Sequence, residues 1–328
     1  MAKENSSVQF TLTKEMASSL KGLSAVEIML GHIGLAWNLP FLYPFRKAGV
    51  LFVGLFFFLS GYGLFKSKEN NPNYFKRFLL RRLLLLLAPA YLLYVFGEVC
   101  ITPMVSPIAT VNYVLTHLQP KFFFESLIWF IEEIAVFYVL FYLCYRFFKT
   151  KTANILMTAI TLIAIVVLFI LDKKYAIGAT WYESSLCFVL GIFYAQKEQE
   201  CVRLVQEKWI LKNVIFLLVE TGCIGGFFIL KWENAVDLIL LRNAAAIFFC
   251  GWVITLLQKV RIDYKPLVKL GEASYEIFLL HNAIIYVCST KIRLSSEMQG
   301  LLTVVITILL ALLLHIPLKA LEKLIRKI

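Results

Sequence analysis

Residues 46–66 read RKAGVLFVGLFFFLSGYGLFK, and this stretch decides the fold class. Its ends are basic, and the 18 residues between them, 48–65, carry no charge and are mostly apolar. A helix of about 20 such residues crosses the hydrocarbon core of a bilayer, because it satisfies its own backbone hydrogen bonds where no water is present. The stretch therefore predicts a transmembrane helix.

The composition extends this prediction to the whole chain. Of the 328 residues, 60% are hydrophobic and only 16% are charged, and the mean hydropathy is +0.77. Soluble domains carry about 25% charged residues. We therefore predict an all-α fold, a polytopic transmembrane helical bundle of about ten spans that forms a single domain over residues 1–328. Spans are expected near 20–39, 46–66, 81–101, 126–148, 153–171, 180–197, 210–230, 236–258, 267–290 and 299–319.

The distribution of lysine and arginine predicts the orientation of this bundle. With both termini in the cytoplasm, the inside segments hold 24 of the 33 basic residues and the outside segments hold nine. Cytoplasmic loops carry such an excess, so we expect both termini inside a cell membrane. The net charge of +12 then reflects topology and affinity for anionic membrane lipid. No nucleic-acid partner is expected, since the basic residues lie on short loops rather than on one folded face.

Two ionisable residues of the first expected span share a helix face. Lys21 and His32 are 11 residues apart, so they point the same way, with His32 about 16 Å deeper in the membrane. A charged group inside a span costs roughly 2.5–3.5 kcal/mol on insertion scales and is therefore a candidate functional residue. A boundary cation below a deep imidazole fits a long anionic ligand whose reactive end reaches His32. Structural packing is the alternative for His32.

Further polar residues fall at a similar depth in two other spans. Glu132 and Glu133 lie in the fourth, and in the ninth His281 shares a helix face with Ser274, seven residues before it. Histidine titrates near neutral pH and a carboxylate orients it, so this set predicts an acid/base site. Its expected catalytic members are His32, Glu132, Glu133 and His281. For His281, a hydrogen bond to a neighbouring helix is the alternative.

Four cations cluster between the second and third spans, at the expected inner membrane surface. They are Lys76, Arg77, Arg81 and Arg82. Guanidinium groups match phosphate oxygens in pairs, so the cluster fits a soluble polyphosphate such as coenzyme A. Snorkelling of the same side chains to lipid phosphates is the alternative.

Other residues inside the expected spans show no such phasing. We expect four glutamates to form hydrogen bonds or ion pairs between helices, with Arg242 as a candidate partner. These are Glu27, Glu183, Glu220 and Glu276. His315 is assigned no role. The seven cysteines are scattered without a C-x-x-C pair, so neither a disulfide framework nor a metal site is predicted.

Four motifs follow one another along these spans. Residues 20–32 begin LKGL and end GH, so that ten residues separate Lys21 from His32. Residues 54–62 read GLFFFLSGY, residues 127–131 read LIWFI, and residues 274–281 read SYEIFLLH. The second motif is followed by Arg77, Arg81, Arg82 and Pro89. In this order the motifs resemble the acyltransferase-3 family of bacterial membrane acyltransferases.

The resemblance implies a multi-pass enzyme of the bacterial inner membrane. Its donor substrate would be an acyl-CoA, usually acetyl-CoA, with no permanently bound cofactor. Its acceptor would be a hydroxyl of a surface polysaccharide or lipid-linked sugar, and His32 would act as the base or carry the acyl group. In the family the first-span cation is usually arginine, whereas Lys21 keeps only the charge. The residues expected to bind the donor are Lys21, Ser60, Arg77, Arg81 and Arg82.

Two other functions stay open at this point. A transporter for a small polar solute would use the same intramembrane groups as a pathway, although the chain shows no repeat between its halves. A non-catalytic partner in polysaccharide export would need no chemistry from them. Consumption of a thioester distinguishes the acyltransferase from both.

Overall fold

The computed structural model describes residues 12–96, 129–229 and 235–327, and these residues form eleven α-helices and two short 3-10 helices without a strand. The all-α class predicted from the sequence is therefore confirmed. The α-helices are α1 (Lys14–Ala36), α2 (Tyr43–Glu69), α3 (Phe78–Phe96), α6 (Trp129–Phe147), α7 (Thr150–Tyr175), α8 (Leu186–Gln206), α9 (Trp209–Ile229), α10 (Ala235–Leu256), α11 (Lys265–Glu272), α12 (Ser274–Lys291) and α13 (Ser296–Lys327). The 3-10 helices are η1 (Pro40–Leu42) and η3 (Ala179–Trp181).

Two expected spans differ from the helices that the structure contains. The ninth, 267–290, is two helices, because the chain leaves helical geometry at Ala273 between α11 and α12. The sixth begins later than expected: α8 starts at Leu186, so Glu183 lies in the segment before the helix. The number of spans and the cytoplasmic position of both termini stay predictions.

Among the residues that the structure describes, four helical stretches are long and apolar enough to cross a membrane. The helices α1, α6 and α12 are not among them, and these three carry the polar residues of the predicted acid/base site. These polar groups lower the hydropathy of the three helices; Glu132, Glu133 and His281 are buried within the protein, and His32 is half-buried. The four apolar stretches are Pro40–Glu69, Thr150–Tyr175, Ile239–Leu256 and Ser296–Ile325.

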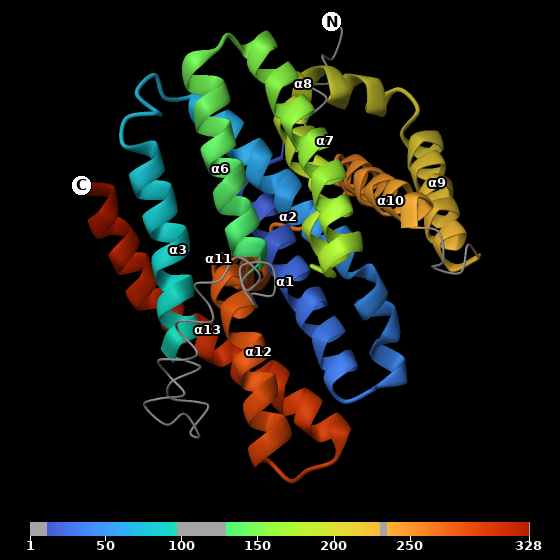
Figure 1. Ribbon diagram of the computed structural model, residues 1–328, viewed down its shortest axis with the longest axis vertical. Coiled ribbons are helices and arrows are strands. Elements are labelled where there is room, and N and C mark those ends of the chain that lie inside the picture. The colour runs from blue at the N-terminus through green and yellow to red at the C-terminus, as the bar shows by residue number, and fades with distance from the viewer. Residues whose placement is uncertain (1–11, 97–128, 230–234, 328) are drawn as a thin grey trace, which may run out of the picture.

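Helix α1 lies in the middle of the bundle (Figure 1). It packs against α2, α11 and α12, and α2 in turn packs against α8 and α10. Helices α3 and α13 run along one edge of the molecule, and α9 lies at the opposite edge. The first helix, α1, therefore packs against two helices from the last quarter of the chain, α11 and α12.

Two glycines allow α2 and α8 to touch backbone to backbone. A Cβ atom on Gly61 would overlap the carbonyl oxygen of Phe188, and a Cβ atom on Gly191 would overlap that of Phe58. Small residues commonly bring membrane helices together in this way. Aromatic packing surrounds the contact, since the Phe188 ring stacks on that of Phe137 with 4.5 Å between the centroids.

We predict that Gly61→Ala destabilises the protein while Gly63→Ala does not. An added methyl group at Gly61 must push α8 away, whereas nothing lies within 4 Å of a Cβ atom on Gly63. Overpacking of this kind costs roughly 1–3 kcal/mol. The measurement is the midpoint of thermal denaturation of the purified protein in detergent. Equal midpoints for the two variants would contradict the close approach of the helices.

Candidate active site

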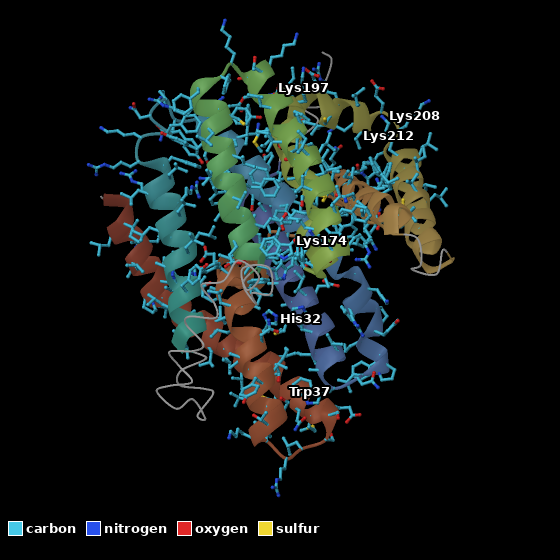
Figure 2. All side chains as sticks on the ribbon, in the orientation of Figure 1. His32, Trp37, Lys174, Lys197, Lys208 and Lys212 are labelled. Carbon is cyan, nitrogen blue, oxygen red and sulfur yellow. The ribbon has the colours of Figure 1, made fainter. Side chains whose placement is uncertain are left out.

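The centre of the candidate site is a pair of histidines from the two ends of the chain. His32 on α1 is half-buried, and His281 on α12 is only 1% exposed. The Nδ1 atom of His32 lies 2.7 Å from the Nε2 atom of His281, and the ring centroids are 4.8 Å apart. Figure 2 shows His32 between α1 and α12, below Lys197, Lys208 and Lys212 and above Trp37. The structure thus brings together two of the four expected catalytic residues.

The surroundings of the pair assign its protons. The Nδ1 atom of His281 lies 3.2 Å from the carbonyl oxygen of Ile277, which only accepts, so Nδ1 of His281 carries the proton. In the neutral ring, Nε2 of His281 is then an acceptor and Nδ1–H of His32 donates to it. In this tautomer the Nε2 atom of His32 carries the lone pair of the ring. The side chain of Asn282 is also within hydrogen-bonding reach of His32.

His32 lines a small cavity of about 430 Å³, which we call the small cavity. Its walls come from α1, the start of α2, the segment before α8, and single residues of α6, α10 and α12. The aromatic side chains of Trp129 and Phe278 form part of the wall. The polar lining includes His32, Arg46, Lys47, Glu183, Ser184 and Arg242.

A large cavity of about 1020 Å³, which we call the large cavity, lies toward the other end of α1. It is lined by cations, several of which are already paired: Nζ of Lys66 lies 2.9 Å from Oε2 of Glu198. Lys21 and Arg82 also line the cavity and are close enough for their positive charges to repel each other, and the Arg82 guanidinium donates a hydrogen bond to the Tyr74 hydroxyl at 3.3 Å. An anion bound between them would relieve this repulsion.

One face of α1 lines both cavities. The residues toward the large cavity are Lys14, Ala17, Ser18 and Lys21, and those toward the small cavity are Ile28, Gly31, His32 and Leu35. These positions repeat at three, four and seven residues, the spacing of one helix face. The shared face of Lys21 and His32 that the sequence predicts therefore lines both cavities, one toward each end of α1. Between them, Ser24 and Ala25 are buried at 0% and 1% exposure.

Both expected carboxylates are buried, but their hydrogen bonds go elsewhere. Oε1 of Glu132 accepts from the Tyr91 hydroxyl at 2.8 Å, and Oε1 of Glu133 accepts from the Ser185 hydroxyl at 2.7 Å. The group that orients His281 is instead the carbonyl of Ile277. The sequence predicted a carboxylate for this role because a pattern of side-chain types does not show where a backbone carbonyl lies.

The expected donor-binding residues separate into two groups. Lys21 and Arg82 line the large cavity, and Ser60 is hydrogen-bonded to Tyr138, which lines it as well. Arg77 and Arg81 do not belong to its lining. Arg77 is exposed in the turn before α3, where its φ angle is +57°. Of the three arginines, the structure therefore places only Arg82 at the cavity.

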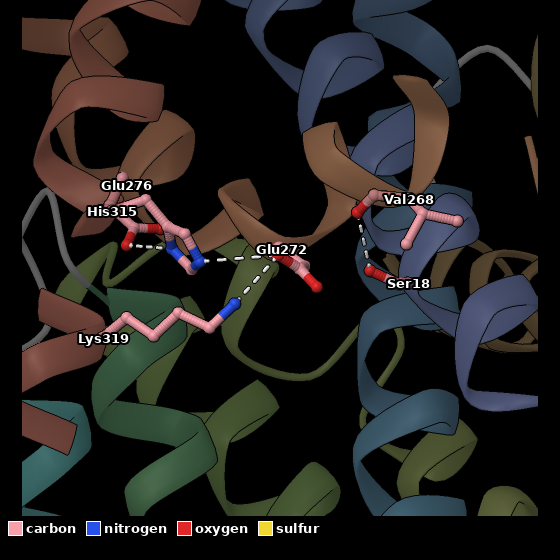
Figure 3. A network of polar contacts seen from close by, with 6 residues as sticks. All are labelled: Ser18, Val268, Glu272, Glu276, His315 and Lys319. Carbon is pink, nitrogen blue, oxygen red and sulfur yellow. Dashed lines mark hydrogen bonds and ion pairs between the residues drawn. The ribbon is translucent and has the colours of Figure 1, made fainter. Parts of the chain in front are cut away.

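A network of polar contacts, in which the sequence predicted a role only for Glu276, forms another part of the large-cavity wall (Figure 3). Oε2 of Glu272 lies 3.1 Å from Nζ of Lys319 and 3.8 Å from Nε2 of His315. Nδ1 of His315 lies 2.9 Å from Oε1 of Glu276. Glu272 and Glu276 are four residues apart, as are His315 and Lys319, and this matching spacing is the signal that the sequence offered.

The glutamates expected to link helices behave in different ways. Glu183 forms an ion pair with Arg242, the partner that the sequence suggested, and Glu276 bonds His315. Glu27 and Glu220 are buried without a hydrogen-bond partner in the described part of the chain. In the same residues, no group of three His, Cys, Asp or Glu side chains is placed to hold a metal ion.

In a comparison with models of protein families, a model described as an acyltransferase domain matches residues 18–318. The matched region contains both histidines and most of the lining of both cavities. Comparison with curated proteins and with solved structures gives no match.

We predict that His32 and His281 are both neutral with the proton on Nδ1. The positions of the protons follow from the chain of bonds that runs from His32 through His281 to the Ile277 carbonyl, and the neutral state follows from the cost of a charge removed from water. The measurement is the ¹⁵N spectrum of the protein labelled in its four histidines, with the two signals assigned by their loss in His32→Ala and His281→Ala. A proton on Nε2 of His32 would contradict the assignment and would leave this residue without a free lone pair toward the small cavity.

Proposed function

Because the chain belongs to the acyltransferase-3 family, we propose that this membrane protein is an O-acyltransferase. It moves an acyl group, in our proposal acetyl, from cytoplasmic acyl-CoA to a hydroxyl of a surface polysaccharide or lipid-linked sugar. The observation that carries the proposal is the hydrogen-bonded His32–His281 pair beside the small cavity, on the α1 face that also lines the large cavity.

The large cavity is the donor site in this proposal. Lys21 and Arg82 bind the phosphates of coenzyme A, and the guanidinium of Arg82 supplies paired contacts that an ammonium group does not. His32 is about 16 Å from Lys21 along α1. To present the thioester to His32, the extended pantetheine arm has to run parallel to α1, past the buried Ser24 and Ala25, so the helices packed against these two residues separate when the donor binds.

The small cavity holds the acceptor hydroxyl next to Nε2 of His32. As the hydroxyl oxygen attacks the thioester carbonyl, a C–O bond forms and Nε2 takes the hydroxyl proton. The C–S bond then breaks, and the proton passes from His32 to the departing sulfur, which leaves as the free thiol of coenzyme A. No proton or electron is left over.

His281 acts on the reaction through His32. While His32 carries the extra proton, its Nδ1–H continues to donate to Nε2 of His281, which keeps the ring in place. His281 is itself fixed by Ile277. His281 is therefore a positioning residue, whereas Glu132 and Glu133 accept hydrogen bonds from Tyr91 and Ser185, which line neither cavity.

We predict that His32→Ala abolishes transfer while the protein still folds and binds coenzyme A. Loss of a general base typically costs a factor of roughly 10²–10⁴ in rate. The measurement is transfer from labelled acetyl-CoA by equal amounts of monodisperse protein, with coenzyme A binding followed in parallel. His281→Ala should cost less than His32→Ala, and His281→Gln should restore part of the loss, because an amide oxygen also accepts from Nδ1–H of His32.

Near-normal turnover in His32→Ala would refute the proposed chemistry. Solute movement without thioester consumption would instead identify a transporter, which would use the same two cavities as its two openings. If the wild-type protein neither transfers an acyl group nor moves a solute, the role of a partner in polysaccharide export would be favoured.

Arg82 and Arg81 should differ in their effect on donor binding, because only Arg82 lines the large cavity. Arg82→Ala should raise KM for acetyl-CoA about tenfold with a smaller change in kcat, because it removes a charge-assisted hydrogen bond to the donor. Arg81→Ala is the matched control, since this side chain does not line the large cavity. The measurement is steady-state kinetics of both variants. Equal increases in KM would place the donor outside the large cavity.

A further inference from the structure

Two serines on one face of α2 lead, through two tyrosines, to the same arginine of α3. Ser60 and Ser67 are seven residues apart and therefore share a helix face. Ser60 shares a hydrogen bond with Tyr138 of α6, and Ser67 shares one with Tyr74 in the turn between α2 and α3. Both tyrosines lie next to Arg82. The arginine is therefore flanked by two hydroxyl groups that α2 holds in place.

The contacts of Arg82 leave part of its guanidinium for a ligand. Nη2 of Arg82 donates to the Tyr74 hydroxyl at 3.3 Å. The Tyr138 hydroxyl is close enough to interact with the charge of the guanidinium, and Tyr138 lines the large cavity together with Arg82. A guanidinium group has five N–H donors in a planar fork, so a bond to one hydroxyl leaves other donors for a phosphate.

The partner of Arg82 is a neutral hydroxyl, whereas other cations of the large cavity are neutralised. Nζ of Lys66, for example, lies 2.9 Å from Oε2 of Glu198, which is buried. Among the described residues, the carboxylate that attracts Arg82 is Glu322, and it does so without a hydrogen bond between them. A carboxylate bonded to the guanidinium would compete with a phosphate for the same N–H groups, but a hydroxyl orders the side chain and keeps its charge.

Packing fixes both tyrosine rings independently of Arg82. The buried ring of Phe78 lies 5.2 Å from the Tyr74 ring and 6.5 Å from the Tyr138 ring, measured between centroids. The backbone N–H of Tyr74 also donates to the carbonyl of Asn71 at 3.0 Å, which fixes the turn. Replacement of either tyrosine by phenylalanine therefore removes a hydroxyl and keeps the packing of the ring.

We infer that Tyr74 and Tyr138 are positioning residues of the donor site, which hold the Arg82 guanidinium in the orientation that binds the phosphates of coenzyme A. The inference rests on the proposed function and deepens its account of the donor. A long side chain that is already ordered loses less rotamer entropy when a ligand binds, so the two hydroxyls raise the affinity for the phosphates. Ser60, which the sequence predicted to bind the donor, acts through Tyr138 in this arrangement.

The test compares coenzyme A with pantetheine, which has the thiol and part of the arm of the donor but no phosphate. The dissociation constants of both are measured by displacement of radiolabelled coenzyme A from the full-length protein in nanodiscs of uncharged lipid. Tyr74→Phe and Tyr138→Phe should each weaken coenzyme A about threefold, and the double variant about tenfold, while pantetheine binds as before. A merely structural role would weaken both ligands by the same factor.

Two further variants locate the effect at Arg82. Tyr142→Phe is the matched control, because the Tyr142 ring stacks on Phe78 with 6.0 Å between the centroids and does not line the large cavity. It should leave both dissociation constants unchanged. In the Arg82→Ala protein, Tyr138→Phe should cause no further loss, because the guanidinium that it positions is gone.

Three results would each overturn the inference. The first is a wild-type affinity for coenzyme A in the double tyrosine variant, and the second is an equal loss for pantetheine. The third is an equal effect of Tyr138→Phe with and without Arg82, since the hydroxyl would then contact the donor itself.

The two proposals fail separately, because binding is measured without transfer. A preference for coenzyme A that depends on the two tyrosines, in a protein that transfers no acyl group, would retain the inference and refute the acyltransferase. Transfer from labelled acetyl-CoA by a protein whose tyrosine variants bind coenzyme A as the wild type does would do the reverse.

Discussion

The hydrogen bond between His32 and His281 joins residues 249 positions apart in the chain, and most of the site depends on it. An imidazole that is removed from water must keep its hydrogen bonds, because an unpaired polar group in an apolar interior is costly. His281 meets this requirement with one contact on its own helix and one on α1. The bond thereby fixes both the rotation of α1 against α12 and the protonation of His32.

The same constraint explains how the neighbouring helices are packed. Helix α11 precedes α12 and crosses α1 so closely that a Cβ atom on Gly22 would overlap the backbone of Gly271. The Ser18 hydroxyl also donates to the carbonyl of Val268 at 3.0 Å (Figure 3). The break at Ala273 then allows α12 to continue in a different direction and to place His281 beside His32.

Hydropathy and helical phasing predicted the helices and the shared face of Lys21 and His32, because both depend only on residue type and spacing. They could not predict how each helix is rotated against its neighbours. The rotation of α6 places Glu132 next to the Tyr91 hydroxyl. The rotation of α3 places Arg82 in the wall of the large cavity and leaves Arg81 out of it. The sequence could predict the ion pair of Glu183 with Arg242, since a charged side chain inside a span requires a partner of opposite charge.

Residue 21 is a lysine where the resemblance leads us to expect an arginine, and the structure has an arginine on a neighbouring helix at the same cavity. Phosphate recognition requires charge and, for specificity, the planar fork of a guanidinium. Lys21 on α1 and Arg82 on α3 line the same cavity, and their mutual repulsion marks the position between them as favourable for an anion. Arg82 can therefore supply the paired contacts that Lys21 lacks, while Lys21 keeps the charge on the α1 face that leads to His32. In the proposed function, the paired phosphate contacts therefore come from α3 rather than from α1.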